Sequence, residues 1–178
     1  MTGMPEGEDG PLRVCFVCSG NICRSVMGEA VLRALLENAG LSDHVAAVSA
    51  GIGDWHIGER ADVRTLAALA GRGYDATAHR AKLFDPLWFD SVDLVVALDR
   101  GNERALRAWA GTDEARDRVV LLRRFDPRLA GMSGAALDVP DPYYDDDAFE
   151  EVLDQVEAAC RGLTAHLGRL VAVGVRPR

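Results

Sequence analysis

Residues 12–25 read LRVCFVCSGNICRS, and this stretch decides the fold. Its first half, 12–18, is a nearly unbroken apolar run, which is typical of a strand buried on both faces of a parallel sheet. After a short polar loop, apolar residues from Met27 to Leu35 repeat at helical spacing until Gly40, a residue type that commonly ends helices. The stretch therefore predicts a strand, a loop and a helix in succession.

The same alternation continues along the rest of the chain. Further strands are predicted at 45–49, 92–98 and 119–122, and further helices at 63–70, 102–110 and 149–170, the last being the longest. Parallel neighbours in a sheet need crossover connections, which place helices over both faces. We therefore expect an α/β fold, a three-layer α/β/α sandwich with a central four-stranded parallel sheet and a phosphate-binding loop after the first strand.

Size and charge limit the class of protein. The chain has 178 residues, 48% of them hydrophobic, which suits a single domain at 12–172 with a flexible N-terminal tail at 1–11 and a C-terminal tail at 173–178. A net charge of −8 disfavours nucleic acid and membrane surfaces as partners, because both require a basic face. The chain shows neither a membrane-spanning run nor a signal peptide, so we expect a cytoplasmic protein, a monomer or a weak homodimer.

The loop after the first strand has the composition of an anion cradle. Five residues separate Cys18 from Arg24. Backbone N–H groups of such a loop can point at phosphate oxygens, the following helix adds its positive end, and the arginine adds a bidentate fork. A thiol in this setting loses its proton readily, so we expect Cys18 to attack phosphorus as a thiolate.

The other loop residues support this interpretation over a structural cysteine beside an ordinary helix start. Gly20 and Asn21 are residue types that accept positive φ, as an inward-turned loop requires. Ser25 is placed to donate a hydrogen bond to the sulfur of Cys18. The predicted phosphate-binding residues are Ser19, Gly20, Asn21, Ile22, Cys23, Arg24 and Ser25.

A candidate proton donor follows near the end of the chain. Asp141 precedes Pro142, Tyr143 and Tyr144, and the two tyrosines are expected to form a wall for a flat aromatic leaving group. The alternative is a simple turn without a catalytic role, because Asp-Pro is a common turn signal and residues 145–147 have the character of a cap for the last helix.

Together the two segments resemble the low molecular weight protein tyrosine phosphatases of bacterial type, whose loop reads Cys-X-Gly-Asn-X-Cys-Arg-Ser and whose acid lies in an Asp-Pro-Tyr-Tyr segment. Further matches are Ser49-Ala50-Gly51, Trp55-His56-Ile57-Gly58, His79-Arg80-Ala81 and Asp99 with Asn102. The resemblance implies that Cys18 is the nucleophile, Arg24 the phosphate clamp and Asp141 the general acid and then the general base. It also implies phosphotyrosine-containing proteins as substrates, with no metal and no organic cofactor.

The resemblance implies supporting roles as well. Asn21 is expected in a polar network with Ser49 and His79, and Trp55 and Tyr143 are expected to flank the substrate ring, with Tyr144 in the same slot. The chain departs from the usual pattern after the loop, where Val26 replaces a proline and Gly28 an alanine.

Three other functions are compatible with part of this pattern. An arsenate reductase of the same fold passes oxidation along additional cysteines, whereas here Cys160 stands alone late in the chain. Phosphoarginine phosphatases tend to carry threonine where this chain has Ile22. A binding module without turnover has no evident use for Cys18 or Asp141. These features favour a tyrosine phosphatase.

Overall fold

The fold is a parallel sheet between two layers of helices, described for residues 10–177 of the chain by a computed structural model. The strands are β1 (Leu12–Cys18), β2 (Val45–Gly51), β3 (Leu94–Ala97) and β4 (Val119–Leu121). All neighbouring strands are parallel, in the order β2-β1-β3-β4.

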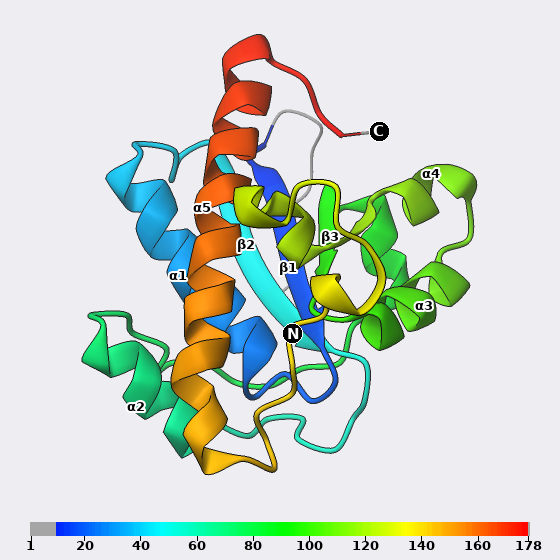
Figure 1. Ribbon diagram of the computed structural model, residues 1–178. Helices are drawn as coiled ribbons and strands as arrows, with labels where there is room; N and C mark the ends of the chain where they lie inside the picture. Colours follow the sequence, from blue (N-terminus) through cyan, green and yellow to red (C-terminus); the bar gives the residue numbers. More distant parts are fainter. Residues whose placement is uncertain (1–9, 178) are drawn as a thin grey trace.

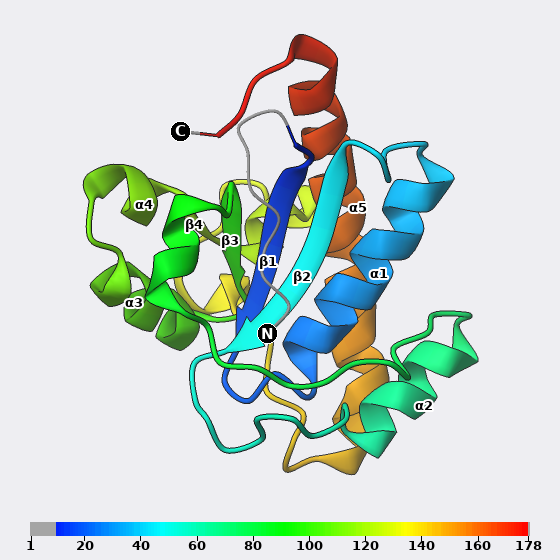
Figure 2. The same ribbon diagram turned by 180° about the vertical axis from the view of Figure 1, so that it is seen from behind.

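Helices cover both faces of this sheet (Figures 1 and 2). One layer holds α1 (Arg24–Asn38), α2 (Val63–Gly71) and α5 (Phe149–Val173), and the other holds α3 (Arg100–Trp109) and α4 (Asp113–Asp117). Short 3₁₀ helices complete the chain: η1 (Pro86–Asp90), η2 (Leu122–Phe125), η3 (Pro127–Leu129), η4 (Gly134–Leu137) and η5 (Asp146–Ala148). The predicted α/β/α sandwich with four parallel strands is confirmed.

The central strand β1 explains why its sequence is an unbroken apolar run. All seven residues are buried, because β1 pairs with β2 on one side and β3 on the other. Val14 and Phe16 pack in the cluster that contains α1 and α5, while Cys15 and Val17 pack in the cluster on the α3 side. Successive side chains point to opposite faces of a strand, so both faces of β1 must be apolar. Cys18 is the last residue of this strand and opens the loop.

Several element boundaries differ from the sequence prediction. The third strand is shorter than 92–98, and β4 ends at Leu121 because Leu122 begins a 3₁₀ turn. The single turn of α4 and the 3₁₀ helices were not predicted, since elements this short carry no measurable periodicity. The long last helix is confirmed, but the expected cap at 145–147 belongs to the 3₁₀ turn before it. Asp145 caps that turn by accepting a hydrogen bond from the N–H of Asp147 (3.1 Å), and Asp146 and Asp147 lie within the turn.

The first and last described parts of the chain lie close together near the start of β1, where Arg176 contacts Gly10. Of the expected tail at 1–11, residues 1–9 lie outside the described residues, as does Arg178. The helix α5 includes Val173, and Gly174, with φ 66°, ends it. Beyond it, Arg176 forms an ion pair with Asp93 (3.0 Å). Within residues 10–177, none of the helices is long and apolar enough to cross a membrane.

Candidate active site

The loop at 18–25 links the end of β1 to the start of α1, and we call it the phosphate loop. Asn21 takes a left-handed conformation with φ 56°, which asparagine adopts more readily than most residues. No side chain caps α1 at Cys23. The first N–H groups of a helix have no intrahelical partner, so the positive end of α1 is directed at the loop.

The sulfur of Cys18 contacts the hydroxyl group of a buried serine. Ser25 Oγ lies 2.9 Å from Cys18 Sγ and accepts a hydrogen bond of 2.9 Å from the Asn21 side-chain amide. When Cys18 is a thiolate, its sulfur can only accept, so the Ser25 hydroxyl donates its hydrogen to it. The arrangement stabilises a negative charge on Cys18.

Asn21 is bound through every polar atom of its side chain. Its amide nitrogen also donates to Ser49 Oγ (2.9 Å), and its side-chain oxygen accepts from the N–H of Lys82 (2.9 Å). Its backbone carbonyl accepts from His79 Nε2 (2.7 Å), which places the ring hydrogen on that nitrogen. Burial lowers the pKa of His79, opposed by this hydrogen bond and by Glu29. The structure thus brings Asn21, Ser49 and His79 together.

Glu29 completes this network and was not singled out by the sequence. It is buried on α1, accepts a short hydrogen bond from Ser49 Oγ, and pairs with Arg33 (2.6 Å). His79 Nδ1 lies 4.0 Å from the Glu29 carboxylate. A glutamate within an otherwise buried stretch of helix is the one sequence signal that could have drawn attention to it.

Arg24 is positioned from behind by the start of α3. Only 2% of its surface is exposed, and its Nη1 donates to Asp99 Oδ2 (2.6 Å) and to the carbonyl of Val139 (2.9 Å). Burial alone lowers the pKa of Arg24, but the negative charges of Cys18, Asp99 and Asp141 raise it above its ordinary value. Its Nη2 lies 3.4 Å from Asp141 Oδ2, so the predicted clamp and the predicted acid are neighbours.

Asp141 lies in a second loop, residues 139–146, which we call the acid loop. The N–H of Val139 donates to the carbonyl of Leu98 (2.8 Å), which anchors this loop at the end of β3. Asp141 Oδ1 accepts from the N–H of Tyr143 (3.2 Å). Its side chain keeps 44% of its surface exposed.

The two loops enclose one pocket of about 370 Å³. Its wall includes Cys18, Ser19, Gly20, Ile22, Cys23, Arg24, Trp55, His56, Asp141, Tyr143 and Tyr144. Asn21, Ser25, Ser49 and His79 lie behind this wall. The predicted loop, acid and slot residues are therefore assembled at one place. Among residues 10–177, no group of histidine, cysteine and acidic side chains is arranged to hold a metal ion.

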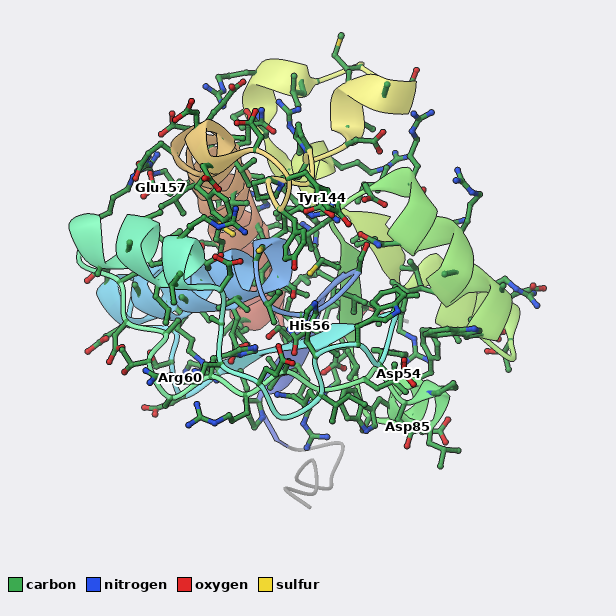
Figure 3. The ribbon with its side chains drawn as sticks, turned by 90° about the horizontal axis from the view of Figure 1, so that it is seen from below. Asp54, His56, Arg60, Asp85, Tyr144 and Glu157 are labelled. Carbon is green, nitrogen blue, oxygen red and sulfur yellow. The ribbon has the colours of Figure 1, made fainter. Side chains whose placement is uncertain are left out.

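Aromatic residues form the open rim of the pocket. Trp55 is 69% exposed and Tyr144 93% exposed, and the rings of Tyr143 and Tyr144 meet edge to face at 4.9 Å. His56 joins this rim, and its Nδ1 lies 2.8 Å from Glu59 Oε2. Figure 3 shows His56 and Tyr144 at this end of the molecule. The sequence alone indicates no role for His56, because the position of this residue depends on how the 52–60 segment folds over Gly20.

Comparison with known proteins agrees with this geometry. The family model described as "Low molecular weight phosphotyrosine protein phosphatase" matches residues 13–173. A low molecular weight protein-tyrosine-phosphatase of Streptomyces coelicolor is 57% identical over 154 residues, covering 86% of this chain and 92% of the relative.

Solved structures of known phosphatases show the same fold. YfkJ from Bacillus subtilis superimposes with a TM-score of 0.82 at 34% identity, over 92% of this chain and 98% of its own. The YwlE arginine phosphatase follows with a TM-score of 0.76 at 26% identity, over 89% and 97%. The match of the family model over nearly the whole chain, together with the close relative, shows that this chain belongs to the low molecular weight phosphotyrosine protein phosphatase family.

Proposed function

We propose that the chain is a protein tyrosine phosphatase that hydrolyses phosphotyrosine in proteins through a phosphocysteine at Cys18. One observation carries the proposal: Cys18 Sγ lies 2.9 Å from the Ser25 hydroxyl, in a pocket that Arg24 and Asp141 also line. A nucleophile, an anion clamp and a carboxyl group thus face the same space.

In the first step, the Cys18 thiolate attacks phosphorus and a sulfur–phosphorus bond forms. The bond between phosphorus and the tyrosine oxygen breaks, and Asp141, in its acid form, gives its proton to that oxygen. The N–H groups of the phosphate loop and the guanidinium of Arg24 stabilise the charge on the remaining phosphoryl oxygens.

In the second step, water attacks the phosphorus of phosphocysteine. The sulfur–phosphorus bond breaks, and the Asp141 carboxylate accepts the proton that water loses. Inorganic phosphate leaves, and the Cys18 thiolate and the Asp141 acid are restored. Water is the only co-reactant of the cycle.

The rim supports an aromatic substrate. Trp55, Tyr143 and Tyr144 offer flat apolar faces at the mouth of the pocket, where a phenyl ring can stack. Ile22 adds an apolar side chain to the wall, at the position where phosphoarginine phosphatases tend to carry threonine. Both features favour phosphotyrosine over the phosphoarginine on which YwlE, as its name states, acts.

The other cysteines disfavour an arsenate reductase. Cys15 and Cys160 are fully buried, and burial raises the pKa of both thiols. Cys23 lines the pocket, but burial raises its pKa to about 12. Among the described cysteines, the three other than Cys18 are therefore poorly suited to relay oxidation as thiolates.

Phosphate release from phosphotyrosine, phosphoserine and phosphoarginine peptides, measured in chelator, tests the proposal. Wild type should act chiefly on phosphotyrosine, Cys18→Ser should be inactive, and Asp141→Asn should be slowed by about 10²- to 10³-fold. Cys160→Ala, a change at a buried thiol away from the pocket, should keep wild-type activity. Undiminished turnover by Cys18→Ser would refute the mechanism, and a preference for phosphoarginine would refute the substrate.

A further inference from the structure

We infer that Arg64, which does not line the pocket, is a positioning residue that fixes the acid loop relative to the phosphate loop. The two loops are far apart in sequence, yet Cys18 and Asp141 must act on the same phosphoryl group. The inference rests on the proposed function, since it concerns the proton transfer assigned to Asp141.

Asp62 joins Arg64 to the phosphate loop. The backbone N–H of Asp62 donates to the carbonyl of Ile22 (3.0 Å). Its carboxylate, largely buried, caps α2 by accepting from the Arg64 N–H (2.9 Å), and it also accepts from Arg64 Nε (2.9 Å) and Nη2 (2.8 Å). Hydrogen bonds from Arg64 lower the pKa of Asp62, so this carboxylate is ionised. A two-pronged contact of this kind fixes the plane of the guanidinium group.

The remaining nitrogen of Arg64 binds the acid loop. Nη1 donates to the carbonyl of Tyr143 (3.1 Å) and to Asp146 Oδ1 (2.5 Å). The guanidinium also lies over the rings of Tyr143 (5.5 Å) and Phe149 (4.6 Å). Tyr143 is the residue whose N–H binds the Asp141 carboxylate. Arg64 therefore binds the carbonyl of the same residue whose N–H orients the proposed acid.

Few other contacts hold this part of the acid loop. Val139 anchors its beginning through Leu98 and Arg24. Asp145 accepts from the N–H groups of Asp147 and Ala148, which directly follow the loop. Beyond Val139, and within the described part of the chain, the hydrogen bonds that reach the acid loop from more distant residues come from Arg64, and Arg24 adds the ion pair with Asp141. Loss of the Arg64 bonds should leave the loop free to move the carboxyl group away from the leaving oxygen.

Arg72 at the other end of α2 provides a matched control. It also bridges several carboxylates: Glu150 (2.6 Å), Asp154 (2.7 Å) and Glu157 (3.3 Å). All three belong to α5, which packs against α2, and none lies in the acid loop. Arg64 and Arg72 thus both attach α2 to its neighbours, but only Arg64 touches the loop that carries Asp141.

The test is the dependence of kcat/KM on the leaving group, measured with aryl phosphates from 4-nitrophenyl phosphate to phenyl phosphate. A proton donor matters most when the departing oxygen is strongly basic. Arg64→Ala should therefore lose about ten-fold on phenyl phosphate and less than about two-fold on 4-nitrophenyl phosphate. In the Asp141→Asn background Arg64→Ala should cause no further loss, and Arg72→Ala should keep the wild-type dependence.

Three outcomes would overturn the assignment of Arg64. Arg64→Ala could lose activity equally on every substrate, or it could lose as much in the Asp141→Asn background as in wild type. Arg72→Ala could also show the same dependence on the leaving group as Arg64→Ala. If Arg64→Ala does not fold, as judged by circular dichroism, Arg64→Lys replaces it, because lysine keeps the charge but cannot bind Asp62 and Tyr143 together. A wild-type protein that cleaves no aryl phosphate would refute the proposed function instead, so the two failures are distinguishable.

Discussion

The phosphate loop and the acid loop meet at one pocket but are held in opposite ways. In the phosphate loop, Asn21, Arg24 and Ser25 are buried, and their partners come from β2, α1 and the start of α3. In the acid loop, Asp141 is about half exposed and Tyr144 almost fully exposed. The proposed nucleophile, Cys18, is thus positioned by the core of the protein, whereas the proposed acid, Asp141, is positioned from the surface. Changes in the first loop should alter stability and activity together, and changes at the rim should alter activity alone.

The largest combined effect on stability and activity is expected from Asn21→Ala. It places alanine at φ 56° and removes the partners of Ser25, Ser49 and the N–H of Lys82. We expect a loss of about 3 kcal/mol in the free energy of unfolding, measured in urea, and of about 10²-fold in kcat/KM.

Asn21→Gly separates the two causes, because glycine accepts positive φ but offers no amide. It should recover part of the stability and little of the activity. An inactive Asn21→Ala variant with wild-type stability would contradict the idea that the core holds the phosphate loop.

Gly28→Ala tests the packing beneath the phosphate loop. A methyl group at this position of α1 would lie 2.4 Å from the buried ring of Phe16 on β1. Overpacking of this kind should exceed the helix preference of alanine, so we expect unfolding to become easier by about 1–2 kcal/mol.

The control for this change is Gly71→Ala at the end of α2, where an added methyl group meets nothing within 4 Å. That variant should be as stable as wild type or slightly more so, as measured by thermal unfolding. Equal behaviour of the two alanine variants would show that Phe16 yields to the added group.

Trp55→Ala tests the rim. We expect KM for a phosphotyrosine peptide to rise about five-fold through loss of ring stacking, with kcat retained. The free energy of unfolding should change by less than about 0.5 kcal/mol, because the side chain is mostly exposed. Leu87→Ala, another exposed apolar residue but outside the pocket wall, should change neither quantity. A large loss of stability in Trp55→Ala would break the distinction between rim and core.

The smallest effect is a pH dependence through His79, whose pKa is lowered by burial. Above about pH 6.5 both folded and unfolded chains keep this ring neutral. As the pH falls below that value, the unfolded chain binds a proton first, so the stability contributed by His79 is lost down to its folded pKa, by at most about 1.4 kcal/mol per pH unit. Urea unfolding at pH 7.5 and 5.5 should show a smaller decrease for His79→Gln than for wild type. An equal decrease would assign the effect to other groups such as His166, whose pKa is also lowered.

The phosphate loop was predictable because the residues that carry its chemistry are contiguous in the sequence. Strand, cysteine, left-handed asparagine and helix start follow one another within 12–25, and each has a local physical reason. Asp141 was found in the same way, through the proline and tyrosines beside it. The order of elements followed from apolar periodicity, which is strong in β1 and α5 and too weak in α4 and the 3₁₀ turns.

The resemblance indicated Ser49 and His79 as supports of the site. The roles of Glu29 and Arg64 were not predictable, because their contacts join residues that are distant in sequence. Ser49 and Glu29 are separated by 20 positions, and Arg64 and Tyr143 by 79. Nothing in the local sequence distinguishes Arg64 from Arg72, since both are arginines at the ends of one helix. Gly28 shows the same limit: helix propensity marks it as unfavourable, and only its contact with Phe16 explains it.

Because β1 lies between two other strands, the residues that determine reactivity and those that determine substrate choice can evolve separately. A shift of Cys18 requires both neighbouring strands to move, whereas the rim comes from 52–60 and 139–146, which are peripheral segments. New substrates can therefore be acquired by replacing short stretches of the gene without disturbing the proposed nucleophile. Libraries that randomise these two segments, with Asp141 and residues 12–25 left unchanged, offer a direct route to phosphatases of altered specificity.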